Sequence, residues 1–173
     1  SKGLLHMCKY SSAESSIDLK NYERASRLIE KPEIQTSMDF DICFKANVPI
    51  DFYPWKNPEL SIPVLIDEWH SIQETIKSRI RSNAKKADKA KMIKGISILI
   101  CLIYWSNECP IHDLDIKSDD FTAFSVKPIN ASERLMYVLL KPEQYHSFVQ
   151  LNQLIEEMLK QYYKNRAMKS REK

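Results

Sequence analysis

The sequence predicts an all-α fold, a single-domain helical bundle of about five helices with an irregular N-terminal arm rich in proline and aromatic residues. Three observations lead to this prediction. The chain has 173 residues, 43% of them hydrophobic, which suits one domain with its own core. It has only two glycines, so glycine-rich phosphate loops and Asn-Gly or Asp-Gly hairpins are missing. Apolar residues recur at helical spacing in several long segments.

The N-terminal part is predicted to hold one short helix and an ordered arm. Residues 1–16 are rich in serine and are typical of a loop. A short helix is expected over 18–31, because Asp18 suits the N-cap and Pro32 restricts the residue before it. Prolines and aromatic residues alternate over 32–63, which favours an ordered irregular arm rather than a disordered linker. We expect its aromatic part, Phe40 to Trp55, to wrap around the outside of the bundle.

Two helices follow the arm, and the second should be central. Apolar residues at spacings of three and four predict an amphipathic helix from Pro63 to Ile80. Residues 87–105 are basic at their start and apolar nearly all round from Ile96, as expected for a helix that others surround. The apolar stretch from Gly95 to Trp105 is too short to cross a bilayer as a helix.

The last third is predicted to hold a polar connection and two helices. Residues 107–124 are acidic and read as the connection, with a weak strand pattern near Phe121 to Val126. Asn130 and Glu133 have the spacing of a capping box and predict the start of a short helix.

Lys141-Pro142 should end that short helix. The final helix is predicted from Tyr145 to Tyr162, fraying into a basic tail. The expected organisation is an N-terminal segment over 1–50, a helical domain over 51–164 and the tail over 165–173.

The charge distribution predicts two basic surface stretches, a main cluster over 79–94 and a second stretch over 160–173. Lys plus Arg is 26 and Asp plus Glu is 23, a smaller excess than a dedicated nucleic-acid binder usually has. A solvated helix face is one interpretation of the main cluster, and neutralisation of nucleic-acid phosphates is the other. The cluster consists of Arg79, Arg81, Lys85, Lys86, Lys89, Lys91 and Lys94.

No metal, cofactor or catalytic site is predicted. Cys109 and His112, with His6 and Cys8, are soft ligands, but they lack the paired spacing of zinc sites. The acidic residues of the 107–124 connection lack the glycine and the glutamate of a calcium-binding loop. No spacing brings a histidine to a particular cysteine as a base. A non-enzymatic protein is therefore expected.

Three segments carry a resemblance to a known family. They are Tyr104-Trp105-Ser106-Asn107, then Lys127-Pro128-Ile129-Asn130-Ala131-Ser132-Glu133-Arg134-Leu135, then Pro142, Tyr145, His146, Phe148, Gln150 and Leu151. Over about residues 52–164 the chain resembles the YpoC-like family of low-GC Gram-positive bacteria. The resemblance implies a small cytosolic protein and no particular activity.

The matching residues have a structural and a functional interpretation. In the structural one, Asn130 and Glu133 cap a helix and Arg134 pairs with a carboxylate of a neighbouring helix. In the functional one, Arg134, Tyr145, His146 and Gln150 form an interaction surface, since Tyr and Arg are enriched at interface hot spots.

We therefore expect a cytoplasmic adaptor that binds another cytosolic protein through a helix surface. No secretion signal is visible near the first residue, and the four cysteines are expected to be free thiols. The alternative is direct nucleic-acid binding through the basic cluster and the tail.

Overall fold

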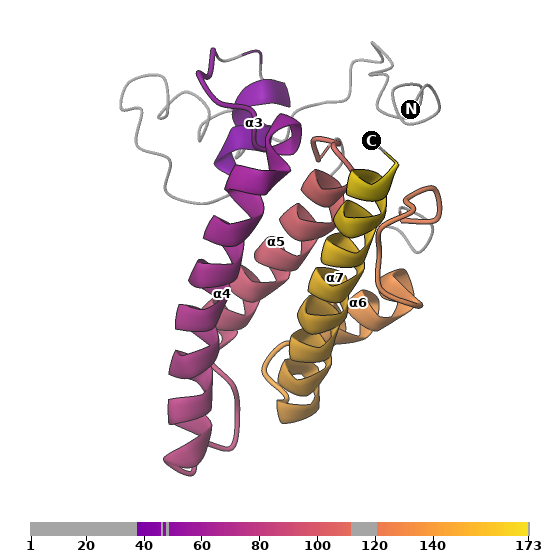
Figure 1. The fold of residues 1–173 in the computed structure, drawn as a ribbon. Coiled ribbons are helices and arrows are strands. Elements are labelled where there is room, and N and C mark those ends of the chain that lie inside the picture. The colour runs from indigo at the N-terminus through magenta and orange to yellow at the C-terminus, as the bar shows by residue number, and fades with distance from the viewer. Residues whose placement is uncertain (1–37, 46, 48, 112–120, 173) are drawn as a thin grey trace.

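The computed structural model describes residues 38–45, 47, 49–111 and 121–172 (Figure 1). Over these residues it has five α-helices and no strand, which confirms the all-α prediction. No helix among them is long and apolar enough to cross a membrane. The helix predicted over 18–31 lies outside the described residues. The helices are α3 (Asp39–Lys45), α4 (Pro58–Arg81), α5 (Lys89–Ser106), α6 (Ala131–Leu140) and α7 (Tyr145–Arg171), with the 3-10 turn η1 (Pro54–Lys56) before α4.

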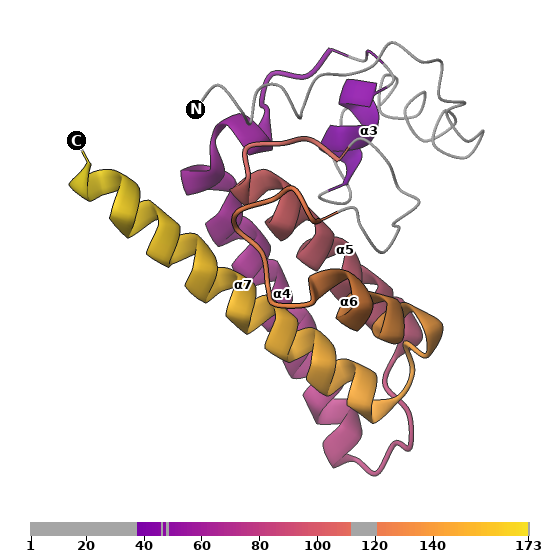
Figure 2. The same ribbon diagram turned by 90° about the vertical axis from the view of Figure 1, so that its right-hand side faces the viewer.

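The central helix is α5, as predicted. Both α4 and α7 pack against it, and every residue from Ile98 to Ser106 is buried. The short α6 packs against α7 (Figure 2). Because α5 is enclosed along its C-terminal half, it needs apolar residues on all sides there, which is the pattern the sequence has.

Helix α4 begins at Pro58, earlier than the Pro63 start predicted from the sequence. The carbonyl of Asn57 accepts from the amides of Leu60 and Ser61 at 3.0 and 3.1 Å, so the first turn forms before Pro63. The Ser61 hydroxyl also donates to the Pro54 carbonyl at 2.9 Å. Pro63 then lies in the second turn, on an exposed position where water can bond to the carbonyl that lacks an amide partner.

The arm over 32–63 is more regular than predicted, because residues 39–45 form α3. Its aromatic residues do supply burial, yet Trp55 enters the core instead of wrapping outside. The Phe40 ring lies edge-on to Trp105, with centroids 6.3 Å apart. The buried carboxyl group of Asp41 accepts from the Trp105 indole at 3.2 Å and from the Ile111 amide at 2.6 Å. These contacts fasten α3 to the C-terminal end of α5.

The strand suggested near Phe121 to Val126 is absent, and these residues form turns and bends. The backbone of Val126 pairs with the buried side chain of Asn107 instead of with a neighbouring strand. Its Nδ2 donates to the carbonyls of Ile103 and Val126, both at 2.7 Å, and its Oδ1 accepts from the Val126 amide at 3.1 Å. The backbone of Val126 is therefore satisfied by one side chain at the end of α5.

The start of α6 and the end of α7 also differ from prediction. The capping box does not form, because Asn130 has a left-handed φ of 51° and its side chain makes no cap hydrogen bond. Lys141-Pro142 does separate α6 from α7, as expected. Helix α7 continues to Arg171 instead of fraying after Tyr162, so most of the basic tail is helical.

Candidate functional site

The predicted basic cluster lies at one end of the bundle, where α4 ends and α5 begins. Three of its seven cations already have carboxylate partners. These ion pairs are exposed, so each contributes little to stability. They are Arg79–Asp88 at 3.3 Å, Arg81–Glu74 at 3.6 Å and Lys86–Glu143 at 3.7 Å.

Four lysines of the cluster form no ion pair with any described residue. Lys89 and Lys91 lie in the first turn of α5, which Asp88 caps by accepting from the Lys91 amide at 3.1 Å. A cation in the first turn of a helix faces the positive end of the helix dipole, so helix stability does not explain these two lysines. We call this set the free lysines, and its members are Lys85, Lys89, Lys91 and Lys94.

The α6–α7 turn is held against the basic loop that joins α4 and α5. The Ala87 amide donates to the Glu143 carbonyl at 2.8 Å, and the Lys86 ammonium pairs with the Glu143 carboxylate. These contacts bring Lys86 and Ala87 beside Glu143, which lies far away in the sequence. The α6–α7 turn, the α4–α5 loop and the start of α5 therefore lie at one end of the molecule (Figure 1).

Exposed apolar side chains flank this turn. Leu140, at the end of α6, is 75% exposed, and Tyr145, at the start of α7, is 52% exposed. We call these two residues the turn pair. The buried face of α6 is made by Ala131, Leu135 and Val138. Leu140 lies outside the helical spacing of these three buried residues. That departure is the sequence signal that could have identified Leu140 as an exposed apolar residue.

Arg134 links α6 to α7 and to the loop before α6 through hydrogen bonds. Its Nη1 donates to the Ile129 carbonyl at 2.9 Å and to Glu157 Oε2 at 2.8 Å, while the Ile129 amide donates to Glu157 Oε1 at 2.7 Å. With the Gln150 amide oxygen turned toward the guanidinium, that oxygen accepts from Nε and Nη2. The predicted pairing of Arg134 with a neighbouring helix is confirmed. The sequence prediction did not name the partner, which is Glu157 of α7.

The electrostatics of Glu157 agree with this geometry. Burial raises the pKa of its carboxyl. The hydrogen bond and charge of Arg134 and the hydrogen bond from the Ile129 amide lower that pKa by more, so it lies below its usual value.

The four residues predicted as an interaction surface separate into two pairs. Arg134 and Gln150 bond to each other, whereas Tyr145 and His146 are both exposed at the start of α7, with ring centroids 6.0 Å apart. Of these four residues, Tyr145 and His146 at the N-terminal end of α7 are therefore the ones whose polar groups can bind a partner.

The remaining sequence candidates concern metals and thiols. His112, His6, Cys8 and most of the acidic connection lie outside the described residues. Within the described part of the chain, no group of three or more His, Cys, Asp or Glu residues is placed to hold a metal ion. Burial raises the pKa of the Cys101 thiol well above its usual value, which keeps it protonated.

Comparison with known proteins agrees with the resemblance seen in the sequence. The family model described as YpoC-like protein matches residues 59–170. The chain is 34% identical over 139 residues to the uncharacterized protein YpoC of Bacillus subtilis (strain 168), an alignment that covers 80% of this chain and 83% of that protein. No solved structure matches the chain.

Proposed function

The chain belongs to the YpoC-like family, and we propose that it is a non-enzymatic cytoplasmic adaptor that binds an acidic, partly apolar segment of another protein. The binding surface is the end of the bundle that carries the free lysines and the turn pair. The observation that carries the proposal is their adjacency, which the Ala87–Glu143 hydrogen bond fixes.

The chemistry of this surface specifies the kind of partner. Leu140 and Tyr145 offer apolar area that gains free energy when a partner removes it from water. The free lysines around the turn favour aspartate and glutamate on that partner, and they speed its association. A helix or extended peptide with apolar residues flanked by carboxylates complements both features.

Nucleic acid is the second candidate, and one observation favours it. Four lysines without ion pairs in the described part of the chain lie at the same end of the bundle as the exposed Tyr145, and single-stranded nucleic acids bind to combinations of cations and stacking rings. Leu140 argues for a protein, because an aliphatic side chain gains little from phosphates or bases. Three of the seven predicted cations are also already paired with carboxylates.

Site-specific photo-crosslinking tests the adaptor proposal. A photoreactive phenylalanine analogue replaces Tyr145 in one variant and Tyr163 in the matched control. Both tyrosines are on α7 and about equally exposed, 52% and 53%, and they lie about 27 Å apart along the helix. A protein crosslinked from position 145 and not from position 163 is the expected result.

The crosslinked protein is then purified and its affinity measured. Leu140→Asp and the double variant Lys85→Glu/Lys89→Glu should each weaken binding roughly tenfold or more. The control Lys164→Glu/Arg171→Glu makes the same charge change on exposed positions of α7 and should leave the affinity unchanged. Crosslinking to nucleic acid from position 145, or equal losses in the control, would reject the adaptor proposal.

A further inference from the structure

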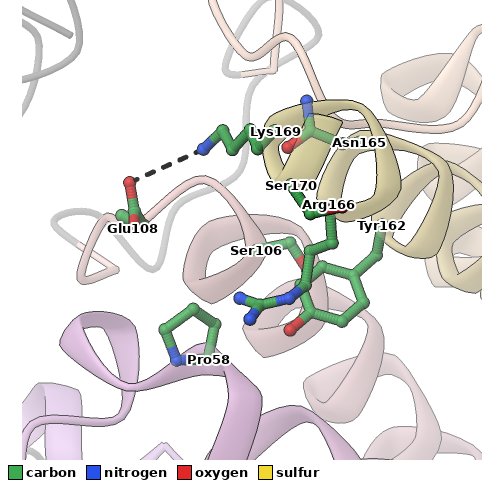
Figure 3. Close-up of a pocket in the computed structure, with 8 residues that line it drawn as sticks. All are labelled: Pro58, Ser106, Glu108, Tyr162, Asn165, Arg166, Lys169 and Ser170. Atoms are coloured by element: carbon green, nitrogen blue, oxygen red, sulfur yellow. Dashed lines mark ion pairs between the residues drawn. The ribbon is translucent and has the colours of Figure 1, made fainter. Parts of the chain in front are cut away.

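A second surface feature lies at the opposite end of the bundle. The N-terminal end of α4, the C-terminal end of α5 and the last turns of α7 enclose a cleft of about 280 Å³ (Figure 3). Its wall includes Ser106 and Glu108 from the end of α5 and Tyr162, Asn165, Arg166 and Lys169 from α7. The α4–α5 loop and the α6–α7 turn lie at the other end (Figure 1).

Two cations reach across the cleft from α7. Arg166 and Lys169 are three residues apart, so they share one side of the helix. The guanidinium of Arg166 lies 5.8 Å from the centre of the Tyr162 ring. In Figure 3 both side chains extend away from α7, Arg166 toward Pro58 and Lys169 toward Glu108.

The carboxylate partners of these cations are loosely held. Arg166 Nη1 is 3.6 Å from Glu59 Oε2, and Lys169 Nζ is 4.0 Å from Glu108 Oε2. All four side chains are about half exposed. Long, exposed ion pairs contribute little free energy, so a bound anion can displace them at small cost.

Ser106, one of the residues that line the same cleft, has a buried hydroxyl without a hydrogen-bond partner among the described residues. The residue is only 7% exposed. A buried hydroxyl without a partner is costly, because it loses its hydrogen bonds to water. Rotation of the Ser106 side chain toward the cleft would let this hydroxyl donate to a bound oxygen atom, which would remove that cost.

Helix stability alone does not account for this arrangement. Cations stabilise the last turn of a helix through the helix dipole, which covers Lys169 and Arg171. Arg166 is more than one turn before the end of α7, where that effect has faded. Its direction toward the cleft and the unpartnered Ser106 hydroxyl are independent of the dipole.

We propose that this cleft binds a phosphomonoester of a small metabolite. The planar guanidinium of Arg166 matches two phosphate oxygens, Lys169 neutralises the second negative charge, and the Ser106 hydroxyl, rotated toward the cleft, donates to a phosphate oxygen. A carboxylate needs only one of the two cations, so the pair selects a group that carries two charges. The volume accommodates a phosphate with a few carbon atoms and excludes a folded polymer.

Calorimetric titration of the full chain tests this proposal. The probes are inorganic phosphate, glycerol 3-phosphate and succinate, a control of equal charge whose two negative charges lie on separate carboxylates. Saturable binding of glycerol 3-phosphate is expected, with succinate weaker. In the double variant Arg166→Gln/Lys169→Gln the affinity should fall roughly tenfold or more.

A matched variant separates the cleft from general charge. Lys164→Gln/Arg171→Gln removes two exposed charges from the same helix and should leave the affinity unchanged. Ser106→Ala should weaken binding several-fold without lowering the melting temperature, since the hydroxyl has no partner to lose. Non-saturable binding, stronger binding of succinate, or equal losses in the matched variant would overturn the proposal. Because the cleft and the turn pair are at opposite ends, either proposal can fail alone.

Discussion

Gly95 of α5 lies directly against the indole of Trp69 in α4. A Cβ atom at position 95 would lie 2.5 Å from Cζ3 of Trp69 and 2.9 Å from Cδ2 of Leu151 in α7. The three principal helices therefore meet at one of the two glycines in the chain. A glycine inside a helix costs about 1 kcal/mol relative to alanine, and here the close approach of three helices requires it.

Gly95→Ala is expected to lower the free energy of unfolding. Overpacking a filled core costs about 1–3 kcal/mol, which exceeds the gain in helix propensity. Trp69 and Leu151 are both buried and have little room to move. Urea denaturation measures the change, with Ser97→Ala on the partly exposed side of α5 as the control. A variant at position 95 that matched or exceeded the stability of the wild type would show that the indole can shift.

Asp41 should make stability depend on pH. Burial raises its pKa to about 7, against the lowering effect of the Ile111 amide and the Trp105 indole. The folded state then keeps this proton up to about pH 7, whereas the unfolded state releases it near the ordinary value of 3.8. The free energy of unfolding contributed by Asp41 therefore falls as pH rises from about 4 to about 7, and stays level above.

The variant Asp41→Asn isolates that contribution. The difference in free energy of unfolding, variant minus wild type, should increase from about pH 5 to about pH 8, because the amide has no proton to lose. Urea unfolding at both pH values gives the comparison, and Asp51→Asn, at an exposed position, is the control. A difference between wild type and Asp41→Asn that did not vary with pH would contradict the raised pKa.

Arg134 and Glu157 should be energetically coupled. The pair is mostly buried, with 23% and 27% of the side chains exposed, and the Ile129 amide shares the carboxylate. In a double-mutant cycle, Arg134→Met and Glu157→Gln should each destabilise the protein, and the double variant should lose less than their sum. Thermal or urea unfolding of the four proteins gives the coupling energy. Additive losses would mean that the guanidinium and the carboxylate act independently.

The lowered pKa of Glu157 adds a pH test to the same pair. Its stabilisation is present above the unfolded-state pKa and is lost as pH falls through the lower folded-state pKa. Wild type and Glu157→Gln should therefore approach each other in stability in acid. A stability gap that widened in acid would reverse the assigned sign.

Lys89→Glu is expected to stabilise the protein while it weakens partner binding. A carboxylate in the first turn of α5 interacts favourably with the helix dipole, by about 0.3–1 kcal/mol, where the lysine does not. Melting temperature and partner affinity should then move in opposite directions. Lys94→Glu, beyond the first turn, is the control for the dipole effect and should change stability less. A fall in the melting temperature of Lys89→Glu would show that this lysine supports the fold.

The sequence by itself determined the helical class, the central position of α5 and the existence of α6 and α7, because burial of a helix repeats every three to four residues along the chain. It also indicated the Arg134 pairing. Only the tertiary structure decided which groups meet across long separations, such as Asp41 with Trp105 and Lys86 with Glu143, and that Ser106 and Arg166 line one cleft. Those contacts depend on how the helices cross and on the paths of the loops, which the helical periodicity of the sequence does not specify. The left-handed Asn130 was not predicted either; beside it, the Ile129 amide donates to Glu157 of α7, a contact that the local capping pattern does not encode.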